Sequence, residues 1–139
     1  MNEGAAMSRP VPAPNPLTAP FWEAAGRGEL VVPECSACGL RFFVPEPACP
    51  RCLSEQWEYV ACSGRGTVYS VTVVHRSPGP GFETPFALAV VDLDDGPALL
   101  THVVGGDPGE VGIGMPVRVV FRRLTDVIVL PYFTRVEGA

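Results

Sequence analysis

Apolar and polar residues alternate along much of the chain from Gly66 onward, with the two-residue period of half-buried β-strands. The alternation marks five strands, at Thr67–His75, Phe86–Leu93, Ala98–Val104, Val117–Leu124 and Val127–Phe133. Asp94-Asp95-Gly96-Pro97 and Thr125-Asp126 have the composition of tight turns, and they separate the second strand from the third and the fourth from the fifth. Within the first strand, the period predicts that Tyr69, Val71 and Val73 share one face.

The segment Gly105–Met115, between the third and fourth predicted strands, interrupts the alternation. Asp107–Glu110 favours one helical turn there, and Gly112 and Gly114 end it. Five strands with an insertion at this position have the layout of an OB-fold barrel. A generic five-stranded barrel or sandwich is the alternative. The sequence therefore predicts a mainly β protein in which residues 61–139 form a five-stranded OB-fold barrel.

The N-terminal part of the chain predicts one short helix, within residues 17–29. Thr18 offers an N-cap, and Gly26 and Gly28 end the helix. At about two turns this helix is too short to persist alone, so Phe21 and Trp22 must pack, either in the core or on a partner. The preceding residues 1–16 contain four prolines and predict a disordered tail.

Four cysteines form two CxxC pairs, Cys35-Ser-Ala-Cys38 and Cys49-Pro-Arg-Cys52, separated by ten residues. Each pair can turn a tight knuckle that brings two thiolates to one ion, and two facing knuckles make a closed tetrahedral site. Soft thiolates select zinc, or iron in a rubredoxin-like centre. Because the protein fills all four positions, we expect a structural zinc. Residues 30–60 then form a zinc ribbon with small strands at Leu30–Val32, Arg41–Val44 and Trp57–Val60.

The residues around the two knuckles refine this prediction. Gly39 follows the first pair and suits the positive φ that such a knuckle demands, whereas Leu53 takes the equivalent place after the second pair. Cys62 lies ten residues beyond the last ligand. We expect Cys62 to be a small packing residue and not a nucleophile.

The charge distribution argues against nucleic-acid binding. The formal net charge is −5, and the ten basic residues are all arginines scattered along the chain. No basic stripe is present to neutralise a phosphate backbone. The sequence shows neither a secretory signal nor an apolar run of the roughly 18 residues that a membrane helix needs. We therefore expect a cytoplasmic protein that does not enter a membrane, where cysteines serve metal binding more often than disulfides.

Three further residues are candidates for a binding site. His75 and Arg76 end the first barrel strand, where they would either meet a phosphate or thioester or lie exposed at the strand edge. Phe82 lies in the proline-stiffened segment Ser77–Pro85, which is either a binding loop or an ordinary connection. His102, inside the third strand, is expected to be structural. No serine or cysteine lies in a recognisable nucleophile motif.

Several short motifs occur together in a specific order: Phe21-Trp22-Glu23, the two knuckles, Ser63-Gly-Arg-Gly-Thr-Val-Tyr-Ser70 and Gly112-Ile-Gly-Met-Pro-Val117. In this combination the chain resembles the OB-fold, acyl-CoA-associated protein family with an N-terminal rubredoxin-like zinc ribbon, known as domain of unknown function thirty-five. The resemblance covers about residues 16–136. The second knuckle departs from the family at Leu53, where a glycine is expected.

The resemblance implies a function that the residues alone do not. Family members pair with thiolase-fold enzymes (thiolases, hydroxymethylglutaryl-CoA synthases, steroid side-chain aldolases) or with hot-dog hydratases, and are thought to help bind or channel the acyl-CoA. It therefore implies a non-catalytic subunit of a hetero-oligomer, with zinc on Cys35, Cys38, Cys49 and Cys52. We expect contacts to acyl-CoA or the partner at Phe21, Trp22, His75, Arg76 and Phe82. The alternatives are a zinc-ribbon/OB-fold nucleic-acid-binding protein and an independent enzyme acting on a CoA thioester.

Overall fold

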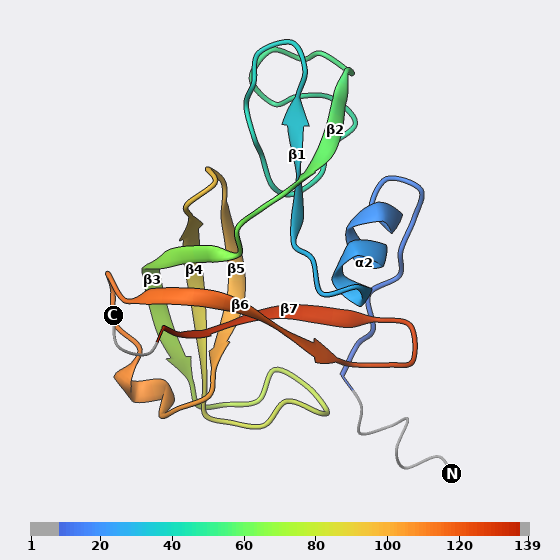
Figure 1. Cartoon of the computed structure of the whole chain (residues 1–139). Helices are drawn as coiled ribbons and strands as arrows, with labels where there is room; N and C mark the ends of the chain where they lie inside the picture. Colours follow the sequence, from blue (N-terminus) through green and yellow to red (C-terminus); the bar gives the residue numbers. More distant parts are fainter. Residues whose placement is uncertain (1–8, 137–139) are drawn as a thin grey trace.

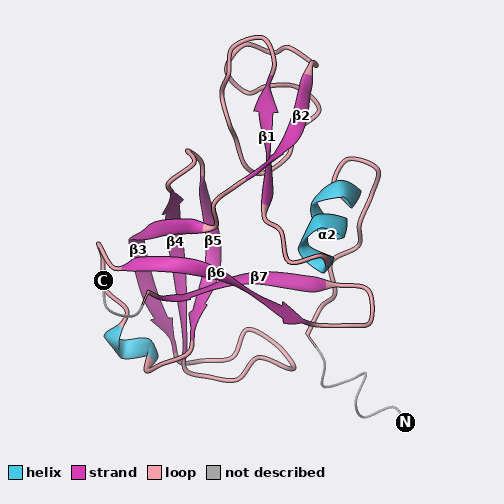
Figure 2. Ribbon diagram, viewed as in Figure 1, coloured by secondary structure: helices cyan, strands magenta, loops and turns pink. Residues whose placement is uncertain are grey.

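The structure, a computed structural model, describes residues 9–136 and contains one α-helix, a two-stranded ribbon and a closed barrel (Figure 1). The elements in chain order are α2 (Ala19–Gly26), β1 (Val31–Cys35), β2 (Trp57–Ala61), β3 (Arg65–Val74), β4 (Phe86–Leu93), β5 (Ala98–Val104), the 3-10 helix η1 (Pro108–Glu110), β6 (Pro116–Arg123) and β7 (Val129–Arg135). Figure 2 shows that strands dominate, as the alternation in the sequence predicted. Among the described residues, no helix is both long and apolar enough to cross a bilayer.

The barrel strands follow the order β3-β4-β5-β7-β6, and β6 pairs back to β3 to close the barrel. All neighbours are antiparallel except β5 and β7, which run parallel. The helix η1 lies between β5 and β6, where the Asp107 side chain accepts a hydrogen bond from the Gly109 N–H at 2.9 Å. This arrangement confirms the OB-fold barrel and excludes a sandwich.

One hydrophobic core joins the helix, the ribbon and the barrel. Phe133 of β7 is fully buried at its centre, and alternate residues of β4 point inward around it. The same cluster continues into Phe21 and Ala24 of α2 and into Val32 of β1. The short helix is therefore held by tertiary packing, because two turns alone are unstable in water.

A polar joint also connects the ribbon to the barrel. Arg41 donates to the Glu34 carboxylate within the ribbon at 2.8 Å and reaches Asp95, in the β4–β5 turn, at 3.5 Å. The other Asp95 carboxylate oxygen accepts from the Ser63 N–H and hydroxyl at 3.0 and 2.8 Å. The turn between β4 and β5 is thus tied to the ribbon and to the segment that leads into β3.

The prediction that Tyr69 shares a face of the first barrel strand with Val71 and Val73 is wrong. A β-bulge between Val68 and Ser70 inserts one residue into β3. Val68 is therefore buried, Tyr69 is 64% exposed, and Val71 returns to the core. A bulge shifts the two-residue period by one position, and the sequence pattern alone does not reveal it.

Two other local predictions are corrected. Arg41–Val44 does not form a strand, because only Arg41 makes an isolated bridge, to Glu34. The last strand begins two residues later than expected because the Thr125 hydroxyl accepts hydrogen bonds from the N–H groups of Val127 and Ile128, which lengthens the turn.

The segment before the helix differs in part from the predicted disordered tail. Residues 1–8 of that prediction lie outside the described residues. Asn15 joins the helix entry: its carbonyl accepts from the N–H groups of Thr18 and Ala19 at 3.0 and 2.8 Å. The Thr18 side chain makes no capping hydrogen bond within the helix and instead accepts from the Asn15 N–H. Arg9 makes a contact with Tyr132 of β7.

Gly64 offers a test of how tightly the barrel closes. A Cβ at Gly64, whose φ is +82°, would meet Val119 Cγ1 at 2.6 Å, whereas a Cβ at Gly28, φ +81°, meets nothing within 4 Å. Both substitutions to alanine carry the same backbone strain, so Gly64→Ala should cost about 1–3 kcal/mol more than Gly28→Ala. Urea unfolding of the two zinc-loaded variants measures the difference. Equal losses would show that β6 moves aside freely.

Candidate functional site

The two CxxC pairs form matching knuckles at one end of the ribbon. In each knuckle the N–H of the residue after the second cysteine donates back to the carbonyl of the first: Gly39 to Cys35 at 2.9 Å and Leu53 to Cys49 at 2.8 Å. Both donor residues have positive φ, +81° at Gly39 and +67° at Leu53. The unfavourable position that the sequence indicated for Leu53 is therefore real.

The four sulfur atoms have the spacing of a tetrahedral zinc site. The Cys35 and Cys52 sulfurs are 3.6 Å apart, those of Cys38 and Cys49 are 3.7 Å apart, and all four lie within 4.8 Å of one another. Zinc–sulfur bonds of about 2.3 Å in a tetrahedron place the sulfurs about 3.8 Å apart. The site therefore fits zinc, and Cys35, Cys38, Cys49 and Cys52 are positioned to bind it. Zinc bound by four protein thiolates serves structure.

The environment of the thiols favours a bound cation. The Leu40 backbone N–H and the Arg51 side chain lower the pKa of Cys38 to about 6. At Cys52 the Ser54 N–H favours the thiolate, but the neighbouring Cys35 and burial outweigh it and raise the pKa to about 11. Thiolates this close repel one another, so the four ionise together only around a cation.

Cys62 takes no part in this centre. Burial, and then the nearby Asp95 carboxylate, raises the pKa of Cys62 to about 11. Its half-buried thiol packs against the main core. A thiol of this kind is protonated near neutral pH and is a poor nucleophile.

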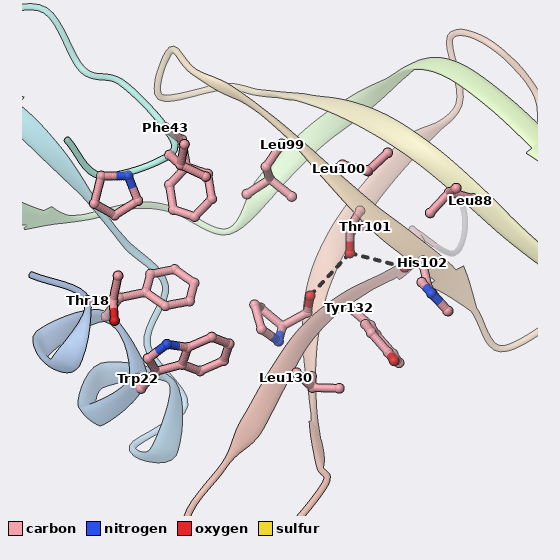
Figure 3. Close-up of a pocket in the computed structure, with 14 residues that line it drawn as sticks. Thr18, Trp22, Phe43, Leu88, Leu99, Leu100, Thr101, His102, Leu130 and Tyr132 are labelled. Carbon is pink, nitrogen blue, oxygen red and sulfur yellow. Dashed lines mark hydrogen bonds between the residues drawn. The ribbon is translucent and has the colours of Figure 1, made fainter. Parts of the chain in front are cut away.

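A second feature is an apolar groove where the helix, the ribbon and the barrel meet. Its volume is about 460 Å³. Figure 3 shows Trp22 from α2 and Phe43 from the ribbon on one side, and the strands β5 and β7 on the other. The lining residues are Thr18, Phe21, Trp22, Phe43, Val44, Pro45, Leu88, Leu99, Leu100, Thr101, His102, Leu130, Pro131 and Tyr132. The charged side chains of Asp, Glu, Lys and Arg are all absent from this lining.

Four aromatic rings form a stack that continues from the mouth of the groove. His102 lies between Phe86 and Tyr132, with ring centroids 4.5 and 4.7 Å away and nearly parallel planes. Phe82 stacks on Phe86 at 6.1 Å. The Arg9 guanidinium lies 5.3 Å from the Phe82 ring centre and donates a hydrogen bond to the Tyr132 hydroxyl. The stack thus carries a cation at its edge.

His102 is shared by the groove and a second, more polar cavity. This second cavity has a volume of about 440 Å³ and is also lined by Arg9, Phe82 and Glu83. Burial, and then the positive charge of Arg9, lowers the pKa of His102 below its usual value. The imidazole is therefore neutral near pH 7, as suits a ring packed between two others.

The structure brings together only some of the residues singled out in the sequence. Trp22 and the largely buried Phe21 line the groove, and Phe82 joins the aromatic stack. His75 and Arg76 are exposed and line neither the groove nor the second cavity. Their predicted role in binding stays a prediction without a structural partner among the described residues.

The sequence analysis did not single out Arg9, Phe43 and Tyr132 of this region, and it expected His102 to be structural without placing it at a groove. His102 and Tyr132 lie at outward positions of β5 and β7, where the strand period predicts polar residues. An aromatic ring at an outward position on each of these strands is the sequence signal that could have indicated a binding surface here. Arg9 lay in the predicted tail, and nothing in its local sequence points to Tyr132.

Loss of one ligand should remove the metal and unfold the ribbon. We expect Cys49→Ser to lower zinc from one per chain to a small fraction, because structural zinc contributes about 10 kcal/mol or more to folding of such modules. Zinc content by mass spectrometry and the amide spectrum of residues 30–60 measure this. Cys62→Ser, the control, should keep one zinc. Full stability of Cys49→Ser after chelation would contradict a structural role.

His102 should make folding stability depend on pH. Its folded pKa lies below the unfolded value of about 6.5, so the unfolded chain takes up the proton first as the pH falls. The stability from neutral His102 is complete above about pH 6.5 and decreases as the pH falls from there toward the folded pKa. Urea unfolding at pH 7.5 and 5.5 should show a smaller loss of stability for His102→Phe than for the unaltered chain. Identical pH dependence in the two proteins would refute this assignment.

Comparisons with known proteins agree with this architecture. Residues 22–58 match the family of the ChsH2 rubredoxin-like zinc ribbon domain, and residues 59–122 match that of the ChsH2 C-terminal OB-fold domain. The chain is also similar to a chain in the solved structure of the Ltp2-ChsH2(DUF35) aldolase, with 39% identity and a TM-score of 0.82. That similarity covers 90% of this chain and 98% of the other.

Two curated relatives are larger proteins. The probable enoyl-CoA hydratase alpha subunit of Thermomonospora curvata is 41% identical over 125 residues, which is 90% of this chain and 39% of that protein. The benzoylsuccinyl-CoA thiolase subunit BbsA of Geobacter metallireducens is 35% identical over 71 residues, covering 51% of this chain and 47% of that protein. This chain therefore spans less than half the length of either relative. With its four-cysteine ribbon, its OB-fold barrel and these similarities, the chain belongs to the DUF35 family.

Proposed function

We propose that the chain is a non-catalytic accessory subunit that binds acyl-CoA for a thiolase-fold partner enzyme. The observation that carries the proposal is the apolar groove of about 460 Å³ that opens beside the Arg9-bearing aromatic stack. An acyl-CoA likewise has an apolar part and a charged part, because its acyl group is joined through a long arm to phosphates. The relatives named as hydratase, aldolase and thiolase subunits support a partner that performs the chemistry.

The size and lining of the groove suit an acyl group. Small-molecule sites have volumes of about 300–1,000 Å³ and are mostly apolar with a few polar groups. Trp22, Phe43 and Leu99 supply apolar walls from three different elements. Each methylene group that moves from water into such a site gains about 0.8 kcal/mol.

The polar groups around the groove are engaged in structural contacts. The Thr101 hydroxyl donates to the Pro131 carbonyl at 3.1 Å, and the Tyr132 hydroxyl accepts from Arg9. His102 is stacked between two rings and has no carboxylate hydrogen-bonded to it in the part of the chain that the structure describes. A nucleophile with an adjacent base is what acyl transfer requires, and we assign that chemistry to the partner.

The proposal includes a cytoplasmic hetero-oligomer that binds no nucleic acid. A zinc site of four thiolates suits a reducing compartment. The net charge of −5 opposes a phosphate backbone, and Arg9 is the single arginine at the aromatic stack in the described chain.

The test is co-expression of the chain with a thiolase-fold protein encoded beside it. We expect the two to co-purify in a fixed ratio, the chain alone to turn over no acyl-CoA, and the pair to act on members of an acyl-CoA panel. Turnover by the chain after rigorous removal of the partner would contradict the accessory role. Tight binding of single-stranded DNA at physiological salt would favour the nucleic-acid alternative instead.

The groove itself can be tested by calorimetry with octanoyl-CoA. Trp22→Ala removes an apolar wall and should weaken binding about tenfold, as expected for the loss of one large buried contact. Tyr69→Ala, which truncates an exposed aromatic outside the groove, should leave the affinity unchanged. Equal affinities for both variants would place the acyl group elsewhere.

A further inference from the structure

The strands β5 and β7 separate where the groove begins. They pair only at Val103 with Phe133 and at Val104 with Thr134. Yet β5 starts five residues before Val103, at Ala98, and β7 starts four residues before Phe133, at Val129. The unpaired parts of the two strands line the barrel side of the groove, opposite Trp22 and Phe43 (Figure 3). The Thr101 hydroxyl donates to the Pro131 carbonyl at 3.1 Å, where the two strands begin to separate.

Pro131 accounts for the separation. On the other side of β7, Val136 N–H donates to the Pro116 carbonyl and Leu124 N–H donates to that of Ile128. Because hydrogen-bonded pairs recur at every second residue of an antiparallel ladder, the even-numbered residues of β7 direct their backbone groups toward β6. The odd-numbered residues 131 and 133 therefore direct theirs toward β5. At position 131 proline has no N–H to donate, and the parallel ladder stops there.

The backbone of β5 that would continue this ladder belongs to Leu100. The Leu93 N–H donates to the Pro97 carbonyl at the end of the ladder between β4 and β5. Because hydrogen-bonded pairs recur at every second residue of an antiparallel ladder, the backbone groups of Leu99 and Thr101 point toward β4. The N–H and C=O of Leu100 therefore point toward β7 and the groove. Leu100 also lines the groove, so a ligand in the groove would lie beside this backbone.

We propose that the opening between β5 and β7 holds the pantetheine arm of the acyl-CoA thioester, whose amides pair with the Leu100 backbone in place of the missing ladder. This inference rests on the proposed function and assigns the part of the ligand that the chain recognises. Pantetheine is an extended thread with two amide groups, and a free strand edge binds extended amide chains through main-chain hydrogen bonds.

The opening has an apolar end and a charged end, and this difference sets the orientation in which the ligand binds. Trp22 and Phe43 close the apolar end, which receives the acyl group. At the other end His102 and Tyr132 lead to Arg9, which meets the phosphates of the nucleotide. Glu83 lines the same cavity as Arg9, but it is exposed to solvent and its charge is screened.

A graded set of ligands tests the amide pairing on the zinc-loaded chain. The probes are octanoyl-CoA, S-octanoylpantetheine with two amides, S-octanoyl-N-acetylcysteamine with one amide, and free octanoate with none. We expect affinity to fall at each step, by about fivefold or more per amide removed, as for a net hydrogen bond of about 1 kcal/mol. Amide exchange of Leu100 should slow when S-octanoylpantetheine binds.

Pro131→Val tests the opening directly. Valine restores the N–H, so β7 can donate to the Leu100 carbonyl and the ladder can close over the groove. We expect at least tenfold weaker binding of S-octanoylpantetheine, without loss of folding stability. Pro116→Val is the matched control, because this exposed strand proline lies on β6 outside the groove, and it should bind within twofold of the unaltered chain.

Arg9→Ala separates the two ends of the ligand. It should weaken the binding of octanoyl-CoA at least fivefold and leave that of S-octanoylpantetheine unchanged. Arg27→Ala removes an exposed arginine that pairs with Glu29, and it should change neither affinity. An equal loss for both probes would contradict the assignment of the phosphates to Arg9.

The outcomes distinguish this inference from the proposed function. If no thioester binds the chain or its complex, the proposed function fails. If all thioesters bind equally whatever their amide count, or if Pro131→Val binds as well as the unaltered chain, the acyl group alone is recognised and the inference fails. Should Pro131→Val not fold, the probe series and the Leu100 exchange still decide. Protection of Leu100 by a peptide of the partner, with none by S-octanoylpantetheine, would show that the opening receives a strand and also overturn the inference.

Discussion

The zinc–thiolate bonds are the constraint on which the rest of the arrangement depends. The ribbon buries only Cys35, Phe42 and Cys49 in its own small cluster, so it has little hydrophobic support apart from the metal. The ribbon in turn holds Phe43 against Phe21 of the helix, with ring centroids 5.3 Å apart. A metal site that performs no chemistry thus fixes one wall of a groove at the far end of the ribbon.

The barrel supplies the other wall of the groove, where β5 and β7 are not paired. Most OB-fold strands must satisfy their backbone groups by pairing, and here one proline leaves a strand edge free beside an apolar surface. In the aromatic stack next to it, His102 is held between two nearly parallel rings. Preorganised edges and rings reduce the entropy that a ligand must lose on binding.

The sequence predicted the architecture well because its signals are local. Cysteine spacing identified the metal site, and the two-residue period identified the five barrel strands. The errors occurred where one residue changed the local geometry: the bulge at Tyr69 shifted a period, and the Thr125 hydroxyl delayed the last strand. The groove was not predictable, since it joins Trp22, Phe43 and Tyr132 from three distant segments. Pro131 was visible in the sequence, but its effect depends on a parallel neighbour that only the fold reveals.

The contact of the N-terminal helix with the last strand has a consequence for synthesis on the ribosome. Phe21 and Phe133 share one core, although they lie 112 positions apart in the sequence. The helix, the ribbon and the first barrel strands emerge from the ribosome before β7 exists, and the core that orders the helix is incomplete until then. A nascent chain therefore holds zinc early but acquires its groove last. Incomplete chains would therefore carry the metal before the groove is complete.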